Sequence, residues 1–498
     1  MSQFGEYLRE LLYERSLSIS ELSRMSGVER TSLQKSITGN RMLSHDSVEK
    51  LIWSLQLTPE ESEKLRYCYE IFFIGEDRYQ SRKIICRMLE NLVCIGNEDP
   101  SACPGKAIDF SGISSDFMTE ENSLVTGKEN VRHVIQSVFF REISRRDGEV
   151  ELTMPTDMGF FNEFLFCLYK KNKARVKVMQ IIAINRSKTE KKLNLHSVEC
   201  FADILPVCLV SDRQYHPYYY YDTSISRLYT DPFPYFVVTR DCVVCMAADG
   251  EKAFLLNGAE YAAFYRKHFH ILKGHCHALV NYSESLVSSL EEYARVYDPD
   301  NMYVCTHQPC FACECDDEKI RSKIRKDFPG CEEITEACVE WLSCLKNVGM
   351  YHSFFKPEGV ISFMEEGRLD DFPEIVEEIT PEERLELLEM LIFSVESEKR
   401  TSVRMFNGKV FTYPSFISLV TSLKKGMGIF TTSRFENGGP PICVYVHEPD
   451  VSRAFHDFMV SLPASKITCS KEETLRYLKN IHAFYAEKFR NREAGAFV

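Results

Sequence analysis

A run of helix-start and helix-stop signals within the first seventy residues constrains this chain more than any other feature of its sequence. Ser18 to Glu21 form a capping box, in which a serine hydroxyl and a glutamate carboxylate bind free amides at the start of a helix. Gly27 follows shortly after, and glycine favours the left-handed turn that ends a helix. Thr58-Pro59-Glu60-Glu61 is a second start signal. These signals predict several short helices in a small all-α domain.

Apolar residues spaced three and four apart place the helices between these signals. We expect helices over residues 4–14, 18–27, 30–37 and 48–55, and one beginning at Thr58. Gly39 closes the third helix, and a tight glycine turn joins the second to the third. Two short helices joined in this way are typical of a helix-turn-helix unit.

The stretch ISELSRMSGVERTSLQKSITGNR resembles the XRE (lambda-repressor-like) helix-turn-helix family, and the resemblance covers roughly residues 4–69. The matching positions are Leu22, Ser23, Gly27, Val28, Leu33, Gly39 and Arg41. Two positions depart from the family pattern. Glu29 stands where the family usually has a serine or threonine cap, and Ser36 stands where it usually has a hydrophobe. The resemblance implies a DNA-binding domain.

The family's geometry also implies which side chains contact DNA. The third helix would enter the major groove, where arginine can pair with guanine and glutamine with adenine. The residues expected near bases are Arg30, Thr31, Ser32, Gln34 and Lys35, and those expected at phosphates are Ser20, Arg24, Asn40 and Arg41. Residues 27–41 contain three basic residues and one acidic residue, whereas the whole chain has 73 acidic and 60 basic residues. This contrast predicts a positive patch that is confined to one domain.

The remainder of the 498-residue chain is long enough for further domains. Strands expected at 149–154, 175–184 and 206–210, with helices at 157–169 and 189–201 between them, indicate a sheet with crossover helices. Antiparallel strands are expected at 235–239, 242–247 and 253–256, followed by helices at 259–269 and 279–297. Further along we expect a helical region over 317–350, strands at 402–406, 410–413, 427–431 and 442–447, and helices at 451–461 and 471–489.

The expected fold is therefore multidomain. An all-α helix-turn-helix domain (1–75) is followed by a connector helix and linker (76–120), of which 96–112 is rich in glycine, proline and serine. Then come an α/β domain with a mixed sheet (121–300), expected to sense or dimerise, and a helical plus α/β C-terminal domain (301–498), an α+β region. No apolar run is long enough to span a bilayer and the first fifteen residues carry charges, so we expect a cytoplasmic protein.

One cluster has the residue types of a metal site: Cys305, His307, Cys310, Cys313 and Cys315. Thiolates and imidazole bind zinc or an iron–sulfur cluster. The spacing matches no standard zinc motif, and neighbouring side chains on a strand point to opposite faces. A cysteine-rich core segment is therefore the favoured interpretation, and no cofactor is expected.

Two other groups have the residue types of a catalytic or ligand site. His268, His270, His275 and His277 surround Cys276, and a tyrosine run contains Tyr215, Tyr218, Tyr219, Tyr220 and Tyr221. No partner acid is specified near the histidines, and tyrosines along a strand usually pack on one face. There is no H-x-K element, G-x-S-x-G motif, P-loop or G-x-G-x-x-G after a strand. No standard enzyme signature is present.

The sequence thus predicts a bacterial, repressor-like transcriptional regulator of the XRE type. It would bind double-stranded DNA as a homodimer, because one small recognition helix seldom suffices, and would respond to an unidentified small-molecule or protein effector. Two alternatives stay open: a protein-interaction scaffold, and an uncharacterised enzyme carrying a helix-turn-helix targeting domain.

Overall fold

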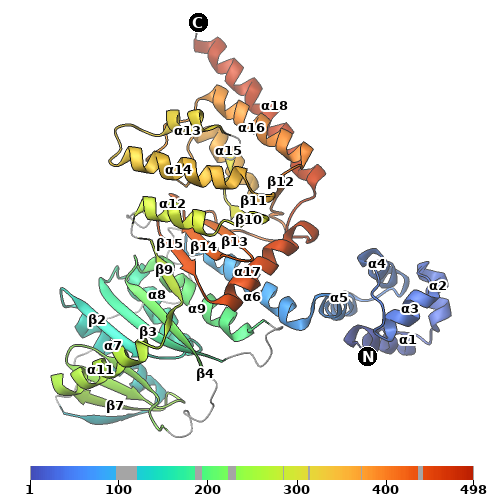
Figure 1. Cartoon of the computed structure of the whole chain (residues 1–498). Coiled ribbons are helices and arrows are strands. Elements are labelled where there is room, and N and C mark those ends of the chain that lie inside the picture. The colour runs from blue at the N-terminus through green and yellow to red at the C-terminus, as the bar shows by residue number, and fades with distance from the viewer. Residues whose placement is uncertain are drawn as a thin grey trace. The chain divides into compact units, whose positions relative to one another are not determined.

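The computed structural model describes residues 2–96, 121–185, 193–222, 231–283, 285–311, 315–371, 373–435 and 441–496 (Figure 1). Contacts divide the chain into two compact units, Met1–Lys83 and Ile84–Val498. The described residues contain 17 α-helices and two mixed β-sheets, which confirms the predicted α/β content. Apart from Gly96, the predicted linker at 96–112 lies outside the described residues. No described helix is long and apolar enough to cross a membrane.

The described part of the first unit is helical. Its helices are α1 (Gln3–Glu14), α2 (Ile19–Ser26), α3 (Arg30–Ile37), α4 (His45–Ser54) and α5 (Pro59–Ile74), and α6 (Glu76–Val93) crosses the boundary between the units. The capping boxes at Ser18 and Thr58 are both present, and Gly27 is left-handed with φ of 68°. The helices predicted from these signals are confirmed. Local signals sufficed because four of the helices α1 to α5 begin at a serine or threonine whose side chain binds an amide of the first turn.

Helix α3 packs closely against α1. A Cβ on Gly5 of α1 would lie 2.1 Å from the carbonyl oxygen of Ile37, so only glycine fits there. Leu33 and Ile37 of α3 are fully buried. Ser36 is buried as well, and its hydroxyl has no hydrogen-bond partner. Close backbone approach and two apolar side chains therefore hold α3 in place, although Ser36 adds no apolar anchor.

The first sheet of the second unit has eight strands in the order β1-β7-β6-β5-β2-β3-β4-β8. Strands β2, β3 and β4 are parallel, and the other pairings are antiparallel. The bounds are β1 (Ser123–Thr126), β2 (Gly148–Thr153), β3 (Val176–Asn185), β4 (Tyr215–Asp222), β5 (Tyr235–Val238), β6 (Cys242–Met246), β7 (Lys252–Asn257) and β8 (His277–Ala278). Helices α7 (Lys128–Ile143), α8 (Gly159–Lys170), α9 (Leu195–Val210) and α11 (Ala259–Lys273) accompany it.

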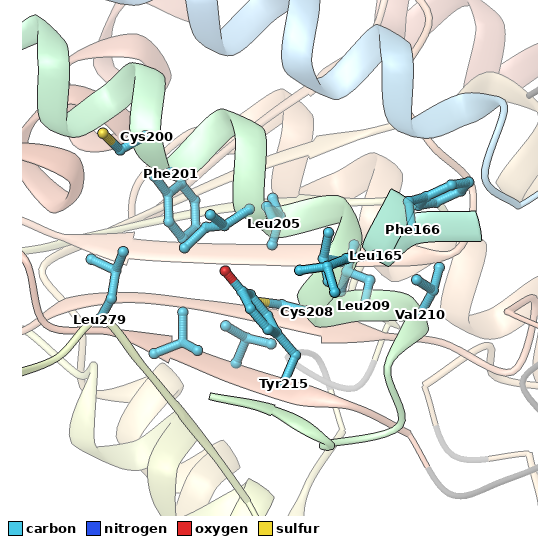
Figure 2. Packing of buried hydrophobic residues seen from close by; sticks show 14 of the residues in the cluster. Leu165, Phe166, Cys200, Phe201, Leu205, Cys208, Leu209, Val210, Tyr215 and Leu279 are labelled. Atoms are coloured by element: carbon cyan, nitrogen blue, oxygen red, sulfur yellow. The ribbon is translucent and has the colours of Figure 1, made fainter. Parts of the chain in front are cut away.

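The strand predicted at 206–210 is wrong, because these residues are the last turns of α9. Pro206 lies inside this helix, and apolar side chains are buried around most of its circumference. A fully buried helix lacks the one-sided apolar pattern that distinguishes a helix from a buried strand. Figure 2 shows Phe201, Leu205 and Cys208 of α9 beside Tyr215 of β4, the actual third parallel strand.

The second sheet has seven strands in the order β12-β11-β10-β13-β14-β15-β9. Strands β10, β11 and β12 are parallel, and the other pairs are antiparallel. The bounds are β9 (Val280–Tyr282), β10 (Asn301–Thr306), β11 (Met350–Phe355), β12 (Thr401–Met405), β13 (Ile417–Ser422), β14 (Gly426–Thr431) and β15 (Cys443–Val446). The helices are α12 (Leu286–Arg295), α13 (Asp317–Lys323), α14 (Cys331–Lys346), α15 (Pro357–Glu366), α16 (Pro381–Ser397), α17 (Pro449–Ser461) and α18 (Lys471–Ala496).

Three predictions for this region need correction. The helix predicted at 279–297 begins instead as β9, which pairs with β15, and becomes helical only in α12. The helical region predicted over 317–350 is broken between α13 and α14, where Gly330 has φ of 75°, and Met350 already belongs to β11. Residues 410–413 form no strand, and the hydroxyl of Tyr413 instead donates to the Cys305 carbonyl oxygen. Each of these wrongly predicted segments forms its strand pairing or its hydrogen bonds with residues that are distant in the sequence.

The apolar cores show how the second unit is layered. The largest cluster joins α7, α8, α9 and α17 to inward faces of both sheets, and Phe201 of α9 contacts Phe455 of α17 edge to face. A smaller cluster packs α11 on the other face of the first sheet. Another packs α12 and α14 on the other face of the second sheet. Both sheets are therefore covered on two faces, so polar groups reach solvent mainly at strand ends.

Candidate functional site

The nine side chains expected to contact DNA lie on α2, on α3 and in the turn after it. Eight of them are exposed, and Ser32 is half-buried. They are Ser20, Arg24, Arg30, Thr31, Ser32, Gln34, Lys35, Asn40 and Arg41. The apolar positions of α3 are buried between them, so the helix presents a polar face to solvent.

The four cations of this surface are Arg24, Arg30, Lys35 and Arg41. None forms an ion pair with any other residue in the described part of the chain. By contrast, Arg15 and Arg66 of the same unit are paired with Glu61 and Glu49. Glu21 acts on Arg24, and Glu29 acts on Lys35 and Arg41, without forming ion pairs with them. Four exposed cations against these two carboxylates leave a local positive field, which is the property that attracts phosphates.

Glu29 is the one acidic side chain at the start of α3. It makes no capping hydrogen bond to the helix backbone. Its carboxylate instead accepts hydrogen bonds from the hydroxyls of Thr31 and Ser32, and these bonds lower the pKa of the Glu29 carboxyl. Glu29 therefore stays ionised and holds the two hydroxyls that the resemblance assigns to DNA.

A second group of polar side chains meets at one edge of the second sheet. Strands β10 and β11 are parallel and end in register at Thr306 and Phe355, so His307 and Lys356 emerge side by side. The carbonyl oxygen of His307 accepts a hydrogen bond from the Lys356 amide at 3.1 Å. A Cβ on Gly359 would lie 2.0 Å from that oxygen, so glycine is required there. The carboxyl ends of parallel strands are where α/β proteins commonly place ligands.

Asp370 connects the side chains at this edge. Its Oδ2 lies 2.6 Å from Nδ1 of His307, and its Oδ1 lies 2.7 Å from Nε of Arg434. His307 and Asp370 are both almost fully buried. Arg434 follows β14, whose end lies beside the start of β13. Residues from three separate segments thus form one hydrogen-bonded chain, His307–Asp370–Arg434.

His307 belongs to the cysteine-rich segment that carries the metal-type residues. In the described parts of the chain no group of three or more His, Cys, Asp or Glu side chains is placed to hold a metal ion. Cys313 lies outside the described residues. Cys305 is fully buried on β10, and Cys310 and Cys315 are half-buried. The structure instead gives His307 an acidic partner.

The histidines around Cys276 do not form a nucleophile site with it. All four histidines are exposed, and burial raises the pKa of the Cys276 thiol to about 11. Its sulfur lies 3.2 Å from the Leu272 carbonyl oxygen. The tyrosine run forms β4, with Tyr215 and Tyr219 buried, and the hydroxyl of Tyr221 donates to Glu448. These tyrosines are packed side chains of a strand.

Lys356, Asp370 and Arg434 could not be found from the sequence as partners of His307. Asp370 is 63 positions from His307, and Arg434 is 64 positions further on. No local spacing links them. The sequence offered only an indirect signal. A polar residue that directly follows a buried strand is a candidate for the sheet edge, but using this rule required β10 and β11 to be recognised as strands first.

Comparisons with known proteins provide little further guidance. No family model and no curated protein matches the chain. A polyphosphate kinase from Porphyromonas gingivalis is 10% identical, with 78% of this chain and 60% of that one covered and a TM-score of 0.22. A phosphatidylserine synthase from Haemophilus influenzae Rd KW20 is 11% identical, with 76% and 94% covered and a TM-score of 0.22. At these scores neither similarity bears on fold or function.

Proposed function

We propose that this chain is a sequence-specific DNA-binding transcriptional regulator of the XRE type. In this proposal the first unit binds double-stranded DNA and the second unit senses a ligand or partner. The observation that carries the proposal is the set of four exposed cations, Arg24, Arg30, Lys35 and Arg41, which lie on α2, on α3 and in the turn after it and form no ion pair with a described residue. They occur in a chain whose total charge is negative, so their field is confined to this surface.

The side chains on α3 have the chemistry of base recognition. Arg30, Gln34 and Lys35 are exposed and contribute guanidinium, amide and ammonium groups of the kind that bind base edges in the major groove. Arg24 and Arg41 flank them and would neutralise phosphates. A single short helix contacts few base pairs, so the regulator would act as a homodimer on a site with approximate two-fold symmetry.

The first test is selection of DNA by the purified full-length protein. Sheared DNA from its source is incubated with the protein at near-physiological salt, and the bound fragments are sequenced. Enrichment of one short, near-palindromic sequence supports a dimeric regulator. The absence of any enriched sequence, while circular dichroism shows that the protein is folded, contradicts the proposal.

Charge variants then separate base recognition from phosphate binding. Arg30→Ala should cost about 1–3 kcal/mol on the selected site and relax preference at one base pair. Arg41→Ala should weaken binding to all sequences similarly and reduce the slope of log K against log salt concentration by about 1. Lys50→Ala is the matched control, because it removes an exposed cation of the same unit from α4. Binding unaffected by Arg30→Ala and Lys35→Ala would favour the interaction-scaffold alternative.

A further inference from the structure

Three side-chain nitrogens at the edge of the second sheet have no hydrogen-bond partner within normal distance among the described residues. Nη2 of Arg434 is buried without a hydrogen-bond partner, although the carboxylate of Glu366 lies 3.5 Å away. Nε2 of His307 forms no hydrogen bond with a described residue, and because Nδ1 faces the Asp370 carboxylate, Nε2 is a second donor only when the ring is protonated at both nitrogens. The Lys356 ammonium forms no ion pair with any residue in the described ranges. Of the three, Nη2 of Arg434 is the buried donor, and because buried donors normally have partners, an acceptor from outside the chain is expected beside it.

The Lys356 ammonium and the Arg434 guanidinium lie near each other at this edge. Burial lowers the pKa of Lys356, the nearby Arg434 guanidinium lowers it further, and Glu358 opposes both effects. Two cations are therefore held close together. The Asp370 carboxylate is already shared by His307 and Arg434, and the carboxylate of Glu366 lies 3.5 Å from Nη2 of Arg434. Asp371 beside it accepts a hydrogen bond from Ser418, and burial raises the pKa of its carboxyl to about 6.

We propose that this edge of the second sheet binds the phosphoryl group of a small ligand, with His307, Lys356 and Arg434 as its donors. A phosphoryl group has three terminal oxygens in a tetrahedral arrangement and accepts bonds from donors on different segments, whereas a carboxylate has two oxygens in one plane. Arginine and lysine are the side chains that proteins commonly use for phosphate. Asp370 positions His307 and Arg434 and does not touch the ligand.

This site is independent of the DNA-binding proposal, because all of its residues belong to the second unit. Its ligand would supply the signal that a sensing region requires. Loss of DNA binding by Arg30→Ala therefore tests one proposal, and loss of phosphate binding by Lys356→Gln tests the other.

The experiment is thermal unfolding of the full-length protein in increasing inorganic phosphate or pyrophosphate, at ionic strength held constant with chloride. Acetate and succinate serve as carboxylate probes. We expect phosphate or pyrophosphate to raise the melting temperature of the second unit in a saturable way, and Lys356→Gln to weaken the apparent affinity at least tenfold. Lys424→Gln is the matched control and should bind as the parent does, because this exposed lysine pairs with Asp300 near the β13–β14 turn.

Chemical modification gives a readout that needs no variant. Bound phosphate should slow carbethoxylation of His307, measured by mass spectrometry on the peptide that contains it, over the same concentration range that shifts the melting temperature. Two outcomes overturn the proposal: phosphate and pyrophosphate stabilise no more than the carboxylates, or Lys356→Gln responds to them as the parent does. An unchanged rate of His307 modification in saturating phosphate also overturns it.

Discussion

The surface formed by α2, α3 and the turn after it (the α2–α3 surface) and the edge of the second sheet at His307 both contain several cations. The residues of these two regions come together in different ways. The nine residues of the α2–α3 surface lie within 22 consecutive positions and are mostly exposed, and the four cations among them form no ion pair in the described chain. The edge draws His307, Lys356, Asp370 and Arg434 from four segments, and Asp370 binds two of them. On the helical surface, the residues of the site are neighbours in the sequence. At the sheet edge, the residues are far apart in the sequence, and the order of the strands brings them together.

The largest effects are expected at two glycines that support these sites. Gly5→Ala would place a Cβ 2.1 Å from the Ile37 carbonyl oxygen, and Gly359→Ala would place one 2.0 Å from the His307 carbonyl oxygen. Each backbone must shift, at a cost of about 3 kcal/mol, the upper end of the usual range for overpacking. Denaturant unfolding of the full-length protein should show loss of stability in the first unit for Gly5→Ala and in the second for Gly359→Ala.

Gly408→Ala is the control, since a Cβ there meets no atom within 4 Å. If Gly5→Ala and Gly359→Ala each destabilised both units equally, the two sites could not be treated as separate. If neither variant lost stability, the close approach of backbone to each glycine would not matter for either site.

The same contrast explains how far the sequence could predict this molecule. The helices of the first unit followed from capping residues such as Ser18 and Thr58, whose partners lie three positions away. Strands β10 and β11 carry the second site but lack such signals, and β9 pairs with β15 about 160 positions later. Strand pairing of this kind depends on burial and topology, which no short window contains. The edge cluster was therefore missed even though His307 itself was noticed.

A second prediction concerns the pH dependence of a charge buried in the second unit. Glu151 on β2 is fully buried, and burial raises the pKa of its carboxyl to about 7, although His270 lies 3.0 Å away. Because the folded protein holds this proton more tightly than the unfolded chain, stability should fall as pH rises from about 4.5 to about 7. The loss attributable to Glu151 is about 3 kcal/mol.

Glu151→Gln should therefore gain stability relative to the parent between pH 5 and pH 8, measured by urea unfolding at both pH values. An unchanged difference between the two proteins across this range would show that Glu151 stays ionised. The cations of the α2–α3 surface are exposed, so we expect the stability of the first unit to change little over the same range.

A third prediction tests Asp370 as the connection between the side chains of the edge. Asp370→Asn keeps the shape of the side chain but leaves Arg434 without its nearest carboxylate and weakens the bond to His307. Loss of charged hydrogen bonds at a mostly buried site should cost about 2–3 kcal/mol of unfolding free energy. Asp327→Asn is the control, because Asp327 is exposed and pairs with the nearby Arg325. Equal, small losses in both variants would mean that the edge is held without Asp370.

The smallest expected effect tests whether Glu29 opposes the function of its surface. Glu29→Ser would provide the side-chain cap that α3 lacks and stabilise the first unit by about 1 kcal/mol. It would also release the hydroxyls of Thr31 and Ser32 and remove a negative charge near the expected phosphates. Glu29→Gln removes the charge without providing a serine cap, so it separates the two effects. Both variants should bind DNA more tightly, but only Glu29→Ser should raise the unfolding midpoint clearly. DNA affinity unchanged in both would place Glu29, and with it the start of α3, away from the DNA.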